Sequence, residues 1–331
     1  MPRRRSFGPR AALGALGGIL ALPLAAAPLA QVAVVGAAAA ALVEGSAARA
    51  EAAEDMSPGT DPPADVGLHW IDVGQGSALL AVGGGAAILV DGGPSSGAEA
   101  VIQALDRHRV RRVDLWLVTH YDADHIGAVS RIIAGADGRW GTGDDLQVDR
   151  FWDRGLDAMP DTDAAAIYRA LAGESRVSAV VGDREVIGAL GLEVVHVGDG
   201  VSENERGVAA RLEVSGITLL IPGDLPASAV AEAAQRAGPV DVLWASHHGS
   251  FDGLSQEVVA LADPWGVVIS AGMDNPYCHP APRVLAWLHD RSVWMTGAAG
   301  LGPGDRCPGI AEFMGPDHAL LAGDLWMSFQ P

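Results

Sequence analysis

Short apolar runs that end in polar clusters are the feature of this sequence that most restricts its fold. Three such runs are DLWLVT, ITLLI and VDVLWAS, and each has the length of a buried strand. They are followed by HYDADHIG, PGD and HHGS, respectively. Functional groups on α/β scaffolds lie where strands meet loops. The sequence therefore predicts a strand-built scaffold that delivers Asp and His side chains from several strand ends.

Strand-like and helix-like stretches alternate from residue 67 to the C-terminus, which predicts an α/β domain. With 49% apolar residues the chain can build a large core, and nothing in its middle has the composition of a linker. One domain over residues 67–331 is the simplest organisation. Helices are expected at 98–107, 126–134, 162–172 and 227–237, and strands at 192–197, 208–214 and 217–221.

The first 50 residues have the layout of an export signal, with arginines ahead of a long Ala- and Leu-rich run. Arg4 and Arg5 fit the start of a twin-arginine signal, and residues 48–50 offer a cleavage site. A retained membrane anchor is the alternative, because residues 11–43 are long enough to span. Either way the domain is expected outside the cytoplasm, periplasmic or extracellular. Residues 51–66, acidic and rich in proline, are predicted to be a linker.

Acidic residues dominate the rest of the chain, where 17 basic residues stand against 40 acidic ones, a formal charge of −23. Such a surface repels polyanions at long range. Cys278 and Cys307 are the only cysteines, and the sequence leaves open whether they pair.

The stretch THYDADHIG holds His120, Asp122, Asp124 and His125. Carboxylates and imidazoles at this density are costly when buried and empty, and a divalent cation reverses that cost. An exposed acidic turn would account for the aspartates but not for the histidines. We therefore expect metal ligands here.

Other strand ends supply the further ligands that a metal site needs. Asp224 ends ITLLIPGD, and His247 and His248 follow VDVLWAS. Downstream of WGVVIS come Asn275, Tyr277 and His279. Convergence of these groups in space would make one metal centre.

These motifs together resemble the metallo-β-lactamase superfamily, and within it the extracellular hydrolase-like domain of ComEC competence proteins and its stand-alone relatives. The resemblance rests on IDVGQG, LVDGG, HYDADHIG, IPGD, SHHGS and NPYCHP, which occur in family order over about 230 residues. It implies a four-layer αββα sandwich, in which helices flank two mixed β-sheets and the metals lie along one edge.

The resemblance implies two divalent metal ions, zinc or manganese, in a hydrolytic centre. The implied metal ligands are His120, Asp122, Asp124, His125, Asp224 and His247, with Asp224 between the ions, and the implied catalytic residues are Asp124, His248 and His279. Which of His247 and His248 coordinates stays open. Asp122 replaces a histidine of the common motif, and a carboxylate there shifts preference toward manganese or magnesium without excluding zinc.

Three positions around this centre remain uncertain from sequence. Either His196 or Asn204 could complete the first metal site. Asp91, in LVDGG, is expected to orient a ligand or the motif loop rather than touch metal, or else to be a turn residue. Cys278 stands where similar proteins tend to have glycine, which puts the shape of the pocket in doubt.

A phosphoester, in nucleic acid or in a smaller molecule such as a wall- or lipid-linked headgroup, is the expected substrate, because paired hard cations suit phosphoryl oxygens. Hydrolysis of a β-lactam or lactone is an alternative, and a catalytically silent binding protein with this fold is another. We expect no stable membrane partner after signal cleavage, and the oligomeric state is open. In the insertion at residues 137–145 a solvated turn is favoured over a calcium loop. Trp140 could line the cleft, whereas Trp70, Trp116 and Trp244 are expected in the core.

Overall fold

The computed structural model describes residues 33–35, 66–272, 275–297, 310–321 and 323–329. Every described residue lies in one compact unit, which begins at residue 31. The predicted export signal and linker therefore lie outside the described residues, apart from Ala33–Val35 and Val66. None of the described helices combines the length and apolar character that a membrane span requires.

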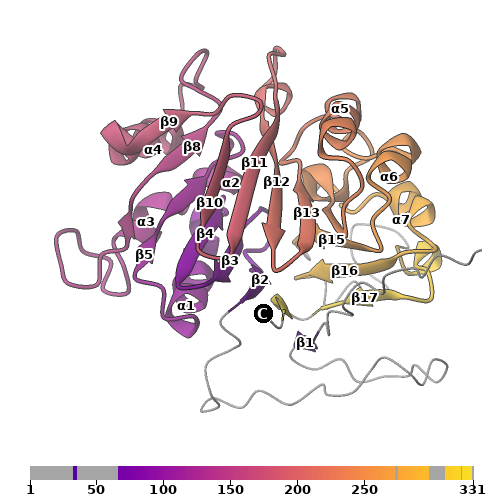
Figure 1. Cartoon of the computed structure of the whole chain (residues 1–331), viewed down its shortest axis with the longest axis horizontal. Coiled ribbons are helices and arrows are strands. Elements are labelled where there is room, and N and C mark those ends of the chain that lie inside the picture. The colour runs from indigo at the N-terminus through magenta and orange to yellow at the C-terminus, as the bar shows by residue number, and fades with distance from the viewer. Residues whose placement is uncertain (1–32, 36–65, 273–274, 298–309, 322, 330–331) are drawn as a thin grey trace, which may run out of the picture. The chain divides into compact units, whose positions relative to one another are not determined.

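The first sheet has eight strands in the order β1-β18-β2-β3-β4-β6-β8-β9 (Figure 1). Pairing is antiparallel from β1 to β4 and parallel from β4 to β9. The strands are β1 (Ala33–Val35), β2 (Gly67–Trp70), β3 (Leu79–Gly83), β4 (Ala86–Val90), β6 (Leu115–Leu117), β8 (Phe151–Asp153), β9 (Arg176–Ser178) and β18 (Leu325–Ser328).

The second sheet also has eight strands and runs in order from β10 to β17. It is antiparallel from β10 to β13 and parallel from there on. Its strands are β10 (Arg184–Ile187), β11 (Leu190–Val197), β12 (Val208–Val214), β13 (Ile217–Ile221), β14 (Val242–Trp244), β15 (Gly266–Ser270), β16 (Ser292–Thr296) and β17 (His318–Leu320). Two short strands, β5 (Arg112–Val113) and β7 (Gln147–Val148), pair separately.

Helices cover the outer face of each sheet, with α1, α3 and α4 on one side and α5, α6 and α7 on the other (Figure 1). They are α1 (Ala98–Arg107), α2 (Ala123–Ile126), α3 (Val129–Ile133), α4 (Asp163–Ala172), α5 (Ala227–Ala237), α6 (Gln256–Ala262) and α7 (Pro282–Trp287). Short 3₁₀ helices are η1 (Ser95–Gly97), η2 (Gly173–Ser175), η3 (Asn204–Arg206), η4 (Ser246–Gly249) and η5 (Ile310–Phe313).

Alternation of side chains along the strands produces the layers. In β4, Ile88 and Val90 enter the core between the sheets, whereas Leu89 packs under α1 and its neighbours. In β13, Leu219 joins the same central core and Leu220 packs under the helices on the other side. Because both faces of each sheet are covered, these strands are continuous apolar runs. The predicted αββα sandwich is confirmed, and Trp70, Trp116 and Trp244 are buried as expected.

The helix expected at 126–134 is instead two short helices, α2 and α3. In one continuous helix the Asp124 carbonyl would accept the Ala128 N–H. Here that carbonyl accepts Ser77 N–H at 3.1 Å, and Ala128 N–H donates to Gly93 O at 3.0 Å. Loops from the first sheet therefore take the hydrogen bonds that would join the two helices. The other three helix predictions agree with α1, α4 and α5, and Thr162 caps α4 through its side chain.

Candidate metal centre

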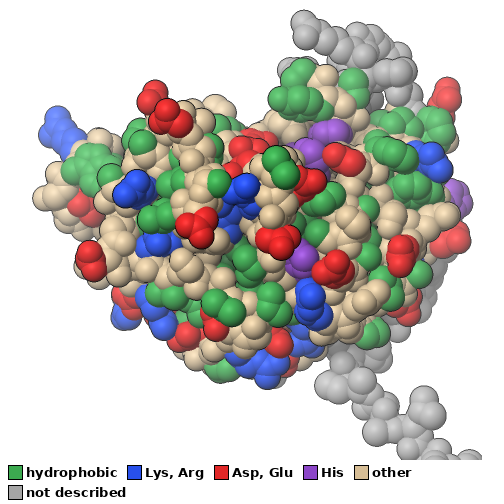
Figure 2. All heavy atoms as spheres, turned by 90° about the horizontal axis from the view of Figure 1, so that it is seen from above, with side chains coloured by type: hydrophobic (Ala, Val, Ile, Leu, Met, Phe, Trp, Pro, Cys, Tyr) green, Lys and Arg blue, Asp and Glu red, His purple; other side chains and the backbone are tan. Residues whose placement is uncertain are grey.

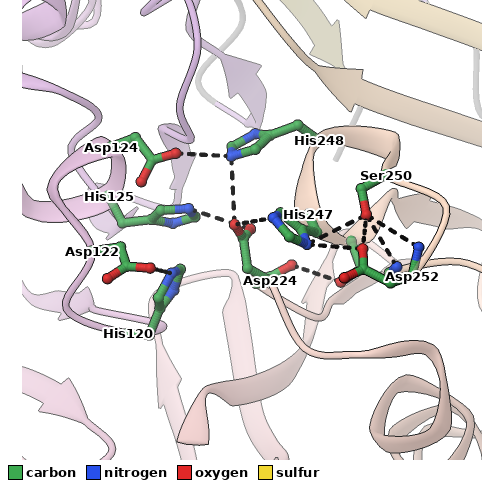
Figure 3. Close-up of polar contacts among 12 residues, drawn as sticks. His120, Asp122, Asp124, His125, Asp224, His247, His248, Ser250 and Asp252 are labelled. Atoms are coloured by element: carbon green, nitrogen blue, oxygen red, sulfur yellow. Dashed lines mark hydrogen bonds and ion pairs between the residues drawn. The ribbon is translucent and has the colours of Figure 1, made fainter. Parts of the chain in front are cut away.

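Loops that follow strands of both sheets meet at the candidate site, and Figure 3 shows the side chains carried by the loops after β6, β13 and β14. The loop after β6 in the first sheet carries the motif with His120 and His125. In the second sheet, Asp224 follows β13 and His248 follows β14, while β15 leads to His279. The chemistry-bearing residues thus sit on loops held by rigid, buried strands, which fixes their positions.

Asp124, His125, Asp224 and His248 form a compact group, in which one ligand atom of each lies within 4.8 Å of the others. His125 Nε2 is 3.3 Å from Asp224 Oδ1, and His248 Nε2 is 3.5 Å from Asp224 Oδ2. His248 Nε2 also lies 3.2 Å from Asp124 Oδ2. Imidazoles and carboxylates that converge in this way are suitable ligands for a divalent cation.

His120 and Asp122 form a second pair beside this group. His120 Nε2 lies 3.6 Å from Asp122 Oδ2, and the His120 ring centroid lies 4.0 Å from that of His125. His120 also contributes to the lowered pKa of Asp224, so the two side chains are close enough for their charges to interact. The pair of His120 and Asp122 therefore adjoins the compact group.

Hydrogen bonds behind the site orient two of the imidazoles. Asp91, 1% exposed, accepts from His125 Nδ1 at 2.7 Å and from the backbone and hydroxyl of Thr119. His248 Nδ1 donates to the Ser270 carbonyl at 2.9 Å. Each bond holds Nδ1 away from the site and leaves Nε2 to face it, as in metal-binding histidines.

Two imidazole nitrogens at the site lack the hydrogen bonds that buried nitrogens normally make, as expected for atoms that bind a cation. Among the described residues, the buried Nε2 atoms of His120 and His125 make no hydrogen bond of good geometry, although a carboxylate oxygen lies near each, from Asp122 at 3.6 Å and from Asp224 at 3.3 Å. Buried polar atoms of folded proteins are nearly always paired, so two unpaired nitrogens at one site require an explanation. A divalent cation supplies it, because a neutral imidazole donates its lone pair to metal.

The carboxylates and imidazoles of the compact group shift one another's pKa values. Burial alone would raise the pKa of Asp224, but the His125 and His248 charges outweigh it and hold this pKa well below its usual range. Burial would also raise the pKa of Asp124. The hydrogen bond with His248 and the charge of His125 outweigh burial and lower this pKa to about 2. Despite its burial, His125 has a pKa well above the ordinary value because Asp224 and Asp91 face it. Carboxylates that stay ionised here favour cation binding.

His247 and His248 point in different directions although they are adjacent. Both have left-handed backbones, with φ of 51° and 55°. His247 Nε2 is 3.9 Å from Asp224 Oδ2, and its Nδ1 is 3.2 Å from Asp252. The resemblance placed His247 among the ligands and His248 in catalysis, and it left open which of the two coordinates. The compact group contains His248, and His247 lies beside it.

His279 borders the site through ring contacts. Its ring centroid lies 5.6 Å from that of His247 and 6.5 Å from that of His248. Burial and the two neighbouring imidazoles lower the pKa of His279 to about 4. Asn275 holds the loop, accepting His279 N–H at 2.8 Å and donating to its carbonyl at 2.9 Å.

The two candidates for completing the first site differ in position. His196 contacts Arg236 and Glu232 on α5 and belongs to a surface ion-pair cluster. Asn204 belongs to a segment that adjoins the motif loop, since Glu203 accepts Tyr121 N–H at 2.8 Å and Val208 N–H donates to Thr119 O at 2.8 Å.

The insertion is a hydrogen-bonded surface turn. Asp137, Asp144 and Asp145 accept backbone N–H groups within the insertion itself, at 2.6–2.9 Å. Trp140 is 54% exposed. Cys278 is disulfide-bonded, and Cys307 lies outside the described residues.

Sequence reasoning missed Thr119, Ser270, Glu203 and Arg154 as supports of the site. Thr119 and Ser270 gave a weak signal, because each is a polar residue at the end of an apolar run. Glu203 and Arg154 gave none, since their pairing across 49 residues is visible only in the folded chain.

The chain is similar to two curated proteins from bacteria. ComE operon protein 3 of Bacillus subtilis is 25% identical over 250 residues, which cover 68% of this chain and 31% of that protein. Recombination protein 2 of Haemophilus influenzae is 26% identical over 229 residues, covering 67% of this chain and 26% of that protein. The chain thus spans less than a third of the length of either relative.

Among solved structures, the metallo-beta-lactamase fold protein YhfI from Bacillus subtilis is 12% identical with a TM-score of 0.46, covering 79% of this chain and all of that one. CmlA, a diiron beta-hydroxylase from Streptomyces venezuelae, is 18% identical with a TM-score of 0.43, covering 65% of this chain and 46% of its own. The family model described as the metallo-beta-lactamase superfamily matches residues 71–272. With this match over most of its length, the chain belongs to the metallo-beta-lactamase superfamily, whose members are generally metal-dependent hydrolases.

Proposed function

We propose that this protein is an exported hydrolase that cleaves phosphodiesters with two divalent cations, zinc or manganese. The observation that carries the proposal is the position of Asp224, buried between His125 and His248 and electrostatically coupled to His120. His120 and Asp122 would hold one cation. Asp124, His125 and His248 would hold the other, with the Asp224 carboxylate between them.

Paired cations, when bound, lower the pKa of a shared water and offset charge on the attacked phosphoryl group. The chain's own residues then keep the imidazoles in place, because Asp91 and the Ser270 carbonyl fix the Nδ1 atoms of His125 and His248. Holding the groups that bind and activate the reactants in fixed positions lowers the activation free energy of hydrolysis.

A proton donor for the leaving oxygen is the remaining requirement. His247 lies beside the compact group, and its Nδ1 contacts the Asp252 carboxylate at 3.2 Å, which orients the ring with Nε2 toward the site. The pKa of His279, near 4, leaves that ring neutral at neutral pH, so it is a poorer donor. We propose His247 as the general acid and His279 as a neighbour that shapes the pocket.

Two considerations support phosphodiesters as the substrate class. Carboxylate-rich ligand sets suit hard cations, which in turn suit phosphoryl oxygens. One of the curated relatives, Recombination protein 2, is named for recombination, which is a reaction of DNA. The formal charge of −19 argues against tight binding of a long polyanion, which favours short substrates.

Metal analysis combined with hydrolysis assays tests the proposal. The metal-depleted protein is reloaded with Mn²⁺ or Zn²⁺, its metal content is measured, and turnover of bis-p-nitrophenyl phosphate and nitrocefin is compared. We expect two equivalents of metal and turnover of the phosphodiester. Asp224→Asn should lose metal and lower turnover by at least ~100-fold, whereas Asp161→Asn, a matched change at an exposed aspartate, should leave both unchanged.

Other outcomes would point elsewhere. Turnover of nitrocefin alone would replace the phosphodiester with a β-lactam. Absence of both metal and turnover would leave a binding protein that keeps the fold, and the proposal would be withdrawn.

A further inference from the structure

Exposed aromatic rings beside the candidate metal centre have no function in the proposal so far. Tyr277 is 67% exposed and Phe251 is 54% exposed, so both rings present apolar surface on an acidic protein. Seen from above, histidine and acidic side chains gather on this face, with hydrophobic side chains next to them (Figure 2). These rings belong to the loops that carry His248 and His279.

Tyr277 continues a series of rings that starts at the metal-binding group. Its ring is stacked on His279, with centroids 5.8 Å apart and planes 16° apart. His279 in turn is 25° from parallel with His248, at 6.5 Å. One face of Tyr277 is thus occupied by His279, while most of the side chain stays open to solvent. A further flat ring can stack there.

Arg283 lies over a second pair of rings on the same side of the centre. Its guanidinium carbon is 5.1 Å from the Phe251 centroid and 5.3 Å from the Trp287 centroid. Among the described residues, Arg283 makes no ion pair with a carboxylate, although acidic residues outnumber basic ones by 41 to 22. An exposed arginine without a carboxylate partner is available to an anion.

Backbone contacts make these groups one assembly. Ala281 N–H, at the start of α7, donates to Gly249 O at 2.9 Å in the turn that carries His247 and His248. A Cβ at Gly249 would lie 2.8 Å from the Cβ of Pro280, so the two loops are in close contact there. The Asn275 side chain closes the loop from residue 275 to residue 279. Tyr277 is therefore held within the loop that carries His279, and Arg283 is held on the helix that follows this loop.

We propose that Tyr277, stacked on His279, is a subsite for an unpaired nucleobase of the phosphodiester substrate, and that Arg283 contacts a neighbouring phosphate. This inference rests on the proposed function and narrows its substrate class. Aromatic side chains that flank a basic group bind single-stranded nucleotides by stacking and charge. A base in a duplex has no free face, so the subsite selects single strands, ends or small nucleotide diesters over duplex DNA.

Binding to the metal-depleted protein tests this subsite without relying on catalysis. The ligands are pentathymidylate and the same sugar–phosphate chain without bases, and the dissociation constants are measured by calorimetry. We expect the base-bearing ligand to bind more tightly. Tyr277→Ala should weaken its binding by about 5- to 150-fold, the range for one base on one aromatic ring, and should leave the abasic ligand unaffected. Tyr277→Phe should retain the preference.

Two further variants separate stacking from charge. Arg283→Gln should weaken both ligands by a similar factor, because the phosphates are common to them. Trp265→Ala is the matched aromatic control, since this exposed residue precedes the opposite, amino end of β15 and should change neither constant.

Each failure has its own meaning. Equal binding of the two ligands, binding of neither, or an unchanged preference in Tyr277→Ala would overturn the subsite. A base preference together with absent hydrolysis would instead reject the proposed activity and keep the subsite. Hydrolysis without a base preference would leave a phosphodiesterase that recognises only the phosphate, as an enzyme for a lipid or wall headgroup would.

Discussion

At the scale of single residues, two buried aspartates near the site have different partners. Asp224 faces imidazole nitrogens that need a cation, whereas Asp91 accepts three hydrogen bonds, from Thr119 and from His125. The Asp91 carboxylate is therefore satisfied by protein donors and orients ligands. Sequence analysis left Asp91 between this role and a turn residue, and its contacts support the orienting role.

A second histidine cluster, outside the ligand set, shows how burial and neighbouring charges set a pKa. His69 Nδ1 contacts His108 Nε2 at 3.0 Å, and His69 Nε2 contacts Asp324 at 2.9 Å. Burial, then the charges of His69 and Arg107, lowers the pKa of His108 to about 3. In the unfolded chain this imidazole has an ordinary pKa near 6.5.

The low pKa of His108 predicts a pH-dependent stability. Between about pH 6.5 and pH 3 the unfolded chain binds a proton that the folded chain does not, so the free energy of unfolding falls as the pH falls. In His108→Gln this contribution should be missing. Urea unfolding of both proteins from pH 7 to pH 4 measures it; equal pH slopes for the two proteins would contradict the assignment.

At the scale of elements, an ion pair joins the loop after β8 to the residue that precedes η3, beside the metal motif. Arg154, 2% exposed, makes a two-pronged contact with Glu203 at 2.8 and 2.6 Å. The same Glu203 accepts Tyr121 N–H, and the guanidinium lies 4.4 Å from the Tyr121 ring centroid. This pair thus fixes the motif loop from the side of His120.

Loss of one partner of this ion pair should be costly. Arg154→Met leaves the partly buried Glu203 carboxylate, 14% exposed, without its cation, and we expect a loss of about 3 kcal/mol in the free energy of unfolding. Addition of Glu203→Gln should restore part of it. The matched control is Arg184→Met, which breaks the exposed pair with Glu193 and should cost less than about 1 kcal/mol. Urea denaturation measures the free energy of unfolding of both variants. Equal losses would show that Arg154 does not stabilise the motif loop.

Element boundaries show where local sequence patterns stop being sufficient. Periodicity located α1, α4 and α5 because their apolar faces repeat at helical spacing. It missed the break between α2 and α3, since the bonds that interrupt the helix come from Ser77 and Gly93, more than 30 residues away.

For the whole molecule, net charge should govern the choice of substrate. A formal charge of −19 repels polyanions, and salt screens that repulsion over about 10 Å at 0.1 M. We therefore predict that kcat/KM for pentathymidylate rises as NaCl increases from about 20 to about 200 mM. Bis-p-nitrophenyl phosphate, with one charge, should respond less. A fall with salt, as in proteins that bind DNA through basic surfaces, would reject this prediction.

The sequence by itself determined the scaffold and the types of ligand at this site. Apolar runs such as LHW, AAILV and ITLLI specify buried strands because burial depends on local patterns of side chains, and the polar residues after them had to lie at strand ends. Tertiary structure decided which side chains meet. The left-handed backbone at His247 and His248 turns one ring toward Asp124 and Asp224 and the other toward Asp252. Contacts between residues far apart in sequence depend on how the two sheets pack, which no local pattern encodes.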